Sequence, residues 1–327
     1  MCGTDQKILA GQFPGTRFPH IPGHEFAGEI VALGAGADDW SVGTRVGVEI
    51  HIGCGRCPRC MEGLYNLCDN YGRTERGHAH LGFTVPGGLA EYCAVPIQAL
   101  HRLPDGLSWE EGAFTDNLGV ALWALERAGV HGGENVAVLG SGAFGALAVQ
   151  LAWALGASHV ALVGRRPERM AILQQLPHPT TLIDATPETG ATSPESKVQS
   201  PEARVKELFG GRGADVVVEF AGSESAAREA IGMARRGGRV VLAGSTGPGR
   251  ELKGVDLSTI VRGHLDILGS VANPRGVSHR GLELLASGAV QVKPLITHRF
   301  PLSEFATAWE TFVERRDGAL RVMLQPA

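Results

Sequence analysis

The chain has 327 residues, of which 20% are charged and 43% apolar, and its formal net charge is −4. This length predicts two domains with ample core, and the charge gives no electrostatic basis for binding nucleic acid or an anionic membrane. The chain opens without a basic start or an apolar signal segment, and its most apolar stretch is interrupted by Gly, Ser and Gln, which excludes a membrane span. We therefore expect a cytoplasmic protein, in which six cysteines serve metal binding or catalysis rather than disulfides.

Residues 1–120 are rich in Gly and Pro and carry short strand-like runs separated by turn residues. The clearest runs are residues 26–33, 45–50 and 90–95. This pattern predicts an irregular, β-rich domain.

Four cysteines follow the spacing C-x2-C-x2-C-x7-C, at Cys54, Cys57, Cys60 and Cys68. Four thiolates on one short loop can close a tetrahedral site that has no open position. Soft sulfur ligands select zinc or an iron–sulfur cluster. C-x2-C-x2-C also occurs in ferredoxins, but the longer last spacing and the absence of a second cluster favour zinc. We predict a structural zinc site; the alternative is four reduced cysteines without an ion.

A second set of possible ligands is dispersed along the same region. Cys2 lies in CGTD, His24 and Glu25 in PGHE, and Asp116 in FTDNLG. Each alone has a structural explanation, since a lone histidine is often a satisfied buried residue and an acid before a helix is often an N-cap. Together they supply a thiolate, an imidazole and two carboxylates, and three such ligands with one open position make a catalytic zinc site. Cys93 is left over and is expected to be a small buried hydrophobic residue.

From residue 121 to 270 strands alternate with helices, which predicts a doubly wound parallel sheet. The expected strands are residues 136–139, 160–163, 216–220, 240–243 and 267–268. Residues 177–202, rich in Pro, Thr, Ser and Glu, are expected to form a mobile surface excursion.

The first of these strands leads into Gly140, Gly142 and Gly145, a G-x-G-x-x-G turn that opens an apolar helix. Such glycines permit the tight turn, let the backbone approach a pyrophosphate and let helix and strand pack closely. The helix N-terminus adds free N–H groups and a partial positive charge. Because this spacing lies between a strand and a helix, it predicts a dinucleotide site rather than a structural turn.

The turn after the second strand indicates which dinucleotide binds. An NAD site places a carboxylate about twenty positions after the glycine turn, to accept from the ribose 2′-hydroxyl. Here the strand ends in Gly164, Arg165 and Arg166, so that carboxylate is missing and two guanidinium groups are available to a 2′-phosphate. This favours NADP over NAD; the alternative is an exposed arginine pair at a helix start. The predicted cofactor-binding residues are Gly140, Gly142, Ala143, Phe144, Gly145, Gly164, Arg165 and Arg166.

The remaining residues, 271–327, contain two helix-like runs, 278–286 and 303–315, and a short apolar run at 320–324. We expect this segment to return to the first domain.

With these motifs together, the chain resembles the zinc-dependent medium-chain alcohol and polyol dehydrogenases, which include sorbitol, threonine and secondary-alcohol dehydrogenases. The resemblance rests on CGTD, IPGHEFAGEIVALG, the four-cysteine lobe, GGLAEYCAVP, the glycine turn and ITHRFPLSEFATAWE, in the family order over nearly the whole chain. It implies a GroES-like catalytic domain made of residues 1–120 and 271–327, interrupted by a Rossmann domain at 121–270, with the active site in the cleft between them. It also implies a homo-oligomer, a dimer or a tetramer.

The resemblance also assigns roles to single residues. Cys2 and His24 match catalytic zinc ligands, Asp116 the acidic ligand of polyol and threonine enzymes, and Glu25 the acid that binds zinc without substrate or acts from beside it. Thr4 matches the hydroxyl residue of the proton relay. The turn at Gly164 is similar to the V-G-S-R-P turn of NADP-dependent secondary-alcohol dehydrogenases, with Arg165 in place of serine.

Two positions depart from the family pattern. A few dozen residues normally precede this cysteine, so either the chain start is misplaced or Cys2 lies on a frayed terminus. Lys7 stands where many relatives have a relay histidine; a lysine can still pass a proton if a nearby metal lowers its pKa, but the match to the family relay is weaker.

The sequence thus predicts a zinc-dependent oxidoreductase with one catalytic and one structural zinc per subunit. It would transfer hydride between NADP and a secondary alcohol, polyol or sugar-like substrate, or the corresponding ketone. One alternative is a non-catalytic NADP-binding protein with structural zinc only. Another, a zinc-independent quinone or enoyl reductase of the same fold, would lack the Cys, His and acid set.

Overall fold

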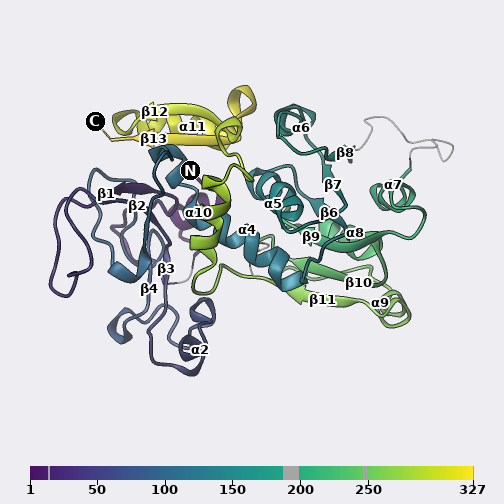
Figure 1. Ribbon diagram of the computed structural model, residues 1–327, viewed down its shortest axis with the longest axis horizontal. Helices are drawn as coiled ribbons and strands as arrows, with labels where there is room; N and C mark the ends of the chain where they lie inside the picture. The colour runs from purple at the N-terminus through teal and green to yellow at the C-terminus, as the bar shows by residue number, and fades with distance from the viewer. Residues whose placement is uncertain (14, 187–198, 246, 248, 327) are drawn as a thin grey trace. The chain divides into compact units, whose positions relative to one another are not determined.

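The computed structural model describes residues 1–13, 15–186, 199–245, 247 and 249–326 (Figure 1). The chain divides into two compact units. The first comprises Met1–Val120, Ala272–Gly288 and Leu295–Ala327, and the second comprises Ala121–Val271 and Ala289–Pro294. The short segment Ala289–Pro294 therefore packs with the second unit, whereas the sequence-based division counts it with the returning segment.

The first unit is built from short strands, as expected for a chain interrupted so often by Gly and Pro. An antiparallel sheet has the order β1-β2-β5, β3 pairs with β4, and β12 pairs with β13 in parallel. The strands are β1 (Ala27–Glu29), β2 (Arg45–Val48), β3 (His51–Ile52), β4 (Ala79–His80), β5 (Leu100–Arg102), β12 (Ile296–Pro301) and β13 (Arg321–Gln325). The helices are α1 (Gly3–Leu9), α2 (Pro58–Met61), α3 (Trp109–Gly112), α10 (Val277–Ala286) and α11 (Phe305–Glu314), and α4 (Thr115–Ala128) begins here.

The second unit is a six-stranded parallel sheet of order β11-β10-β9-β6-β7-β8 (Figure 1). Its strands are β6 (Asn135–Leu139), β7 (His159–Gly164), β8 (Thr181–Asp184), β9 (Ala214–Glu219), β10 (Ala234–Leu242) and β11 (Asp266–Gly269). Its helices are α5 (Ala143–Ala154), α6 (Pro167–Leu173), α7 (Pro201–Leu208), α8 (Glu224–Met233) and α9 (Leu257–Gly263). Short 3₁₀ turns lie at Tyr65–Leu67, Thr74–Arg76, Ile97–Ala99, Lys293–Leu295, Leu302–Glu304 and Arg316–Gly318.

The order of this sheet fixes where a ligand can bind. Both neighbours of β6 are parallel to it, but the chain proceeds outward to β7 on one side and returns to β9 on the other. In open parallel sheets, ligands bind beyond the carboxyl ends of the strands where the order reverses in this way. The buried faces of these strands join one apolar core, which includes Ala137, Val163 and Val217.

Two local predictions from the sequence are wrong. Residues 90–95 form no strand, because they find no partner strand and Tyr92 is 75% exposed. The expected excursion at 177–202 contains β8 and the start of α7. Its middle, residues 187–198, lies outside the described residues.

Candidate metal centres and coenzyme site

The four cysteines of the C-x2-C-x2-C-x7-C spacing meet as one cluster. Their sulfur atoms all lie within 4.8 Å of one another, and the structure records these cysteines as free thiols. Cys57 is the N-cap of α2, whose first turn carries Cys60, and Cys68 follows the 3₁₀ turn Tyr65–Leu67. A chain that wraps four sulfur atoms around one point in this way fits a tetrahedral ion.

Backbone and side-chain N–H groups point at these sulfur atoms. Asn70 donates from its side chain to Cys54 Sγ at 3.2 Å and from its backbone to Cys68 Sγ at 3.4 Å. The Arg56 backbone N–H lowers the pKa of Cys54 to about 6, with help from Asn70, whereas burial raises the pKa of Cys60 to about 12. Four thiols this close cannot all ionise without a cation among them, so the donor set fits zinc.

Cys2, His24 and Glu25 form a second group, whose ligand atoms also lie within 4.8 Å of one another. Cys2 is the N-cap of α1, and His24 and Glu25 lie just before β1. Burial works against a charged His24, but the Asp5 carboxylate and Cys2 hold its pKa well above the usual range. Such surroundings favour positive charge and therefore suit a divalent cation.

Asp5 holds two members of this group in place, a role that the sequence reasoning did not assign. Its Oδ1 accepts from His24 Nδ1 at 3.0 Å, and its Oδ2 accepts from the Cys2 backbone N–H at 3.0 Å. The bond at Nδ1 leaves Nε2 of His24 as the atom available to a metal. Asp5 is 1% exposed, so this carboxylate acts in a low-dielectric environment.

Glu25 is tied to a residue near the other end of the chain. Arg321 on β13 donates to Glu25 Oε2 at 2.5 Å, and Asn117 donates to Oε1 at 2.7 Å. Burial opposes ionisation of Glu25, but Arg321 outweighs it, and the pKa of Glu25 is lowered. Nothing in the local sequence pattern marks Arg321 as a partner of Glu25.

The expectation that Cys2 lies on a frayed terminus is wrong. Met1 is buried, its amino group donates to the Val322 carbonyl at 3.0 Å, and its own carbonyl accepts from Arg321. The apolar cluster around Phe312 contains the Met1 side chain. Met1, the residue before Cys2, is therefore held by β13.

Two other predicted site residues have different surroundings. Asp116, buried at the start of α4, is not a member of the three-residue group; its Oδ1 lies 3.5 Å from the Ile50 backbone nitrogen. Burial and then the Glu49 carboxylate raise the pKa of Asp116 to about 7. Thr4 lies in α1, with Oγ1 3.7 Å from Cys2 Sγ.

The glycine turn is open at Gly142 and tightly packed at Gly145. A Cβ at Gly142 would meet nothing within 4 Å, whereas one at Gly145 would lie 1.8 Å from the Gly140 carbonyl oxygen. The N-cap of α5, Gly142, makes no side-chain cap hydrogen bond. Phe144 stacks on Phe220 at 5.7 Å. The turn therefore fits a pyrophosphate at a helix N-terminus.

The residues predicted to bind the adenosine ribose of the coenzyme lie at the end of β7. Gly164 packs against Ser141 of the glycine turn, where a Cβ would lie 2.6 Å from the serine Cβ. Arg165 pairs with Glu229 and lies 3.5 Å from Ser225 Oγ, and Arg166 is the N-cap of α6. The two guanidinium-bearing residues thus follow the strand next to β6.

A buried imidazole cluster in the first unit was not anticipated. His51 Nε2 and His78 Nε2 are 3.2 Å apart, Tyr71 Oη and His80 Nδ1 are 2.8 Å apart, and the His80 ring stacks on Phe83. Burial, followed by the nearby His78, lowers the pKa of His51 to about 3. These histidines are separated along the chain, so no spacing marks them as a cluster.

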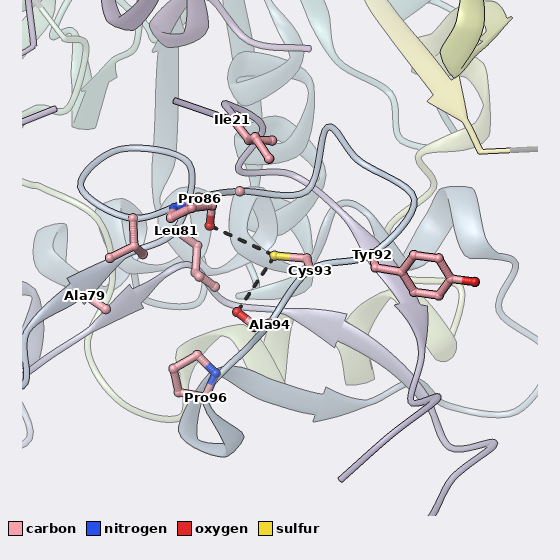
Figure 2. Close-up of a pocket in the computed structure, with 10 residues that line it drawn as sticks. Ile21, Ala79, Leu81, Pro86, Tyr92, Cys93, Ala94 and Pro96 are labelled. Atoms are coloured by element: carbon pink, nitrogen blue, oxygen red, sulfur yellow. Dashed lines mark hydrogen bonds between the residues drawn. The ribbon is translucent and has the colours of Figure 1, made fainter. Parts of the chain in front are cut away.

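Cys93 also differs from expectation. It is half-buried and lines an apolar pocket of about 270 Å³ together with Ile21, Leu81 and Tyr92 (Figure 2). None of the predicted metal ligands lines this pocket. Its wall carries no charged group, so it adds nothing to the metal centres.

Comparisons with known proteins agree with this arrangement. The family described as alcohol dehydrogenase GroES-like domain matches residues 1–105, and the one described as zinc-binding dehydrogenase matches residues 143–287. Sorbitol dehydrogenase from Bacillus subtilis (strain 168) is 31% identical over 100% of this chain and 87% of the relative. An alcohol dehydrogenase structure from Thermus sp. ATN1 is 30% identical, with a TM-score of 0.84 over 100% of this chain and 90% of that one. A zinc-binding dehydrogenase from Sinorhizobium meliloti 1021, bound to NADP, is also 30% identical, with a TM-score of 0.84 over 100% and 89%.

The chain belongs to the zinc-dependent medium-chain alcohol and polyol dehydrogenase family. It combines a GroES-like catalytic domain with a Rossmann dinucleotide-binding domain, and it is an NAD(P)-dependent oxidoreductase of alcohols or polyols. Both the fold class and the family predicted from the sequence are confirmed. Among the described residues, no helix has the length and apolar character needed to cross a membrane.

Proposed function

We propose that this protein oxidises a secondary alcohol or polyol, or reduces the corresponding ketone, with zinc held at Cys2 and His24 and with NADP as coenzyme. The observation that carries the proposal is the group of Cys2, His24 and Glu25 within 4.8 Å, oriented by Asp5. Glu25 is the carboxylate within reach in this arrangement, and Asp116 is the acidic ligand that family resemblance favours. A second zinc is proposed for the four-cysteine cluster.

When bound, the zinc supplies Lewis acidity toward the reacting oxygen, and the nicotinamide exchanges hydride. The protein's own residues position these groups. Asp5 holds His24 by Nδ1 and Cys2 by its backbone, and Arg321 with Asn117 holds Glu25. Thr4, beside Cys2, is the hydroxyl proposed to pass the substrate proton onward.

The zinc content separates this proposal from a non-catalytic alternative. Metal analysis of the purified protein should give two zinc equivalents per subunit, together with turnover on at least one secondary alcohol or polyol. One equivalent, lost when Cys57 is replaced by Ser, would instead indicate a binding protein with structural zinc alone.

The preference for NADP rests on Arg165 and Arg166 and on the missing carboxylate at the end of β7. The bound NADP of the Sinorhizobium relative supports it. Arg165→Ala combined with Arg166→Ala should lower the NADP to NAD ratio of kcat/KM by roughly 10- to 100-fold, because guanidinium–phosphate pairs are lost. An unmodified protein that favours NAD, or a ratio that stays constant, would contradict this part of the proposal.

A further inference from the structure

Arg165, which is proposed to bind the 2′-phosphate, is engaged by another element. Its Nη2 pairs with Glu229 Oε1, and its Nη1 lies 3.5 Å from Ser225 Oγ. Arg165 follows β7, whereas Ser225 and Glu229 belong to α8, which follows β9. Strands β7 and β9 flank β6 on its two sides. The ion pair therefore joins the segments that follow the two strands flanking β6.

The negative charge of Glu229 depends on its pairing with Arg165. Its side chain is 14% exposed, compared with 45% for Arg165, so the carboxylate is the more enclosed member of the pair. Burial raises the pKa of Glu229, and the Arg165 guanidinium opposes that shift. Glu202 also disfavours the charged form and Arg228 favours it. A carboxylate that is largely removed from water is costly without a counter-ion.

A phosphate at the end of β7 would need the same guanidinium. Any bond that Arg165 makes to phosphate weakens its pairing with Glu229, and the Glu229 charge repels the phosphate as well. A coenzyme with a 2′-hydroxyl brings no charge and so does not compete with Glu229.

We propose that Glu229 is a specificity-determining residue, which limits the preference for a 2′-phosphorylated coenzyme by competing with the phosphate for Arg165. This inference rests on the proposed role of Arg165 in NADP binding. The charged groups recorded near Glu229 are Arg165, Glu202 and Arg228, so we expect its effect at the 2′ position that Arg165 is proposed to bind.

The test is a set of coenzyme dissociation constants, measured by fluorescence titration of NADP and NAD at one ionic strength. Glu229→Gln keeps the shape of the side chain and removes its charge. It should tighten NADP by roughly 3- to 10-fold and leave NAD within twofold. The gain should vanish when Arg165→Ala is already present. Glu224→Gln, which removes a charge from the first turn of the same helix, is the matched control and should change NADP binding less.

The outcomes separate the two proposals. If Arg165→Ala and Arg166→Ala leave the dissociation constants of both coenzymes unchanged, the two arginines do not bind the 2′-phosphate. The proposed competition by Glu229 is then overturned as well. If Arg165→Ala weakens NADP but Glu229→Gln does not tighten it, only the role of Glu229 is overturned. A gain that extends equally to NAD, appears equally in Glu224→Gln, or persists without Arg165 also overturns that role. Thermal unfolding without coenzyme checks that each variant is folded.

Discussion

The four-cysteine cluster and the group of Cys2, His24 and Glu25 are both metal-type sites of the first unit, but they are assembled differently. The cluster takes its ligands from residues 54–68, and Asn70, which donates to two of the sulfur atoms, lies only two positions beyond Cys68. The second group takes its ligands from residues 2, 24 and 25, and it is held by Asp5 on α1 and by Arg321 on β13.

This difference is the one expected between a stabilising metal site and a reactive one. A loop that supplies four sulfur ligands closes the coordination shell and leaves no position for substrate. A group with fewer ligands can leave a position open, but its geometry then depends on supporting residues. The supports observed here are the buried carboxylate of Asp5, close to Cys2 along the chain, and the buried guanidinium of Arg321, near the other end. Substitutions in the four-cysteine cluster should therefore lower stability, whereas substitutions in the group of Cys2, His24 and Glu25 should lower activity.

The largest expected effect is on activity. His24→Ala removes the imidazole that Asp5 orients, so kcat/KM should fall on the order of 10³-fold or more, while the NADP dissociation constant stays nearly constant. Steady-state kinetics and coenzyme titration measure the two quantities. His279→Ala, at a side chain 60% exposed, is the control. Retained turnover in His24→Ala would remove this residue from the catalytic site.

A substitution in the four-cysteine cluster should lower the stability of the protein rather than its activity. Cys57→Ser should lose one zinc equivalent per subunit and about 3 kcal/mol of unfolding free energy, since metal binding contributes directly to folding. Metal analysis and denaturant unfolding test this. Cys93→Ser, outside both clusters, should keep its zinc. A Cys57→Ser protein with full zinc content would show that the cluster is wrongly assigned.

Replacing Asp5 tests whether metal binding by Cys2, His24 and Glu25 depends on this supporting carboxylate. Asp5→Asn keeps the size of the side chain but loses its charge and one of its two acceptor oxygens. Zinc affinity at the second site should fall roughly 10- to 100-fold, as is usual when a carboxylate behind a histidine ligand is lost. Competition with a chelator measures this in a protein that retains the cysteine-bound zinc. An unchanged affinity would mean that Asp5 supports the fold only.

The smallest expected effect concerns pH and the imidazole cluster. The pKa of His51 is lowered from 6.5 to about 3, so the unfolded chain binds the proton more readily than the folded one. The contribution of neutral His51 to the free energy of unfolding is therefore fully present above pH 6.5, and it is lost as the pH falls from 6.5 towards 3. Between pH 6.5 and 5 this amounts to roughly 1–2 kcal/mol. His51→Asn, compared with the unmodified protein in denaturant unfolding at each pH, should show a flatter dependence. Parallel curves would exclude the proposed cause.

The sequence predicts those parts of the molecule whose determining residues are neighbours along the chain. The glycine turn, the parallel strands and the four-cysteine loop each carry their determinants within a few residues. Asp5 lies within the quoted CGTD motif, but the sequence does not show that it reaches His24. Arg321 carries no signal, because its partner Glu25 is 296 positions away. The strand expected at 90–95 failed because propensity alone cannot supply a neighbouring strand.

The pairing of Glu25 with Arg321 also sets an order of events when the chain is made. All four cysteines of the cluster have been synthesised once Cys68 is translated, while most of the chain is still to be made. Arg321 and Val322, which anchor Glu25 and Met1, follow about 250 residues later. At the usual elongation rates this is a delay on the order of tens of seconds. A chain at that stage has all the cysteines of the four-cysteine cluster but lacks the β13 residues that contact Glu25 and Met1.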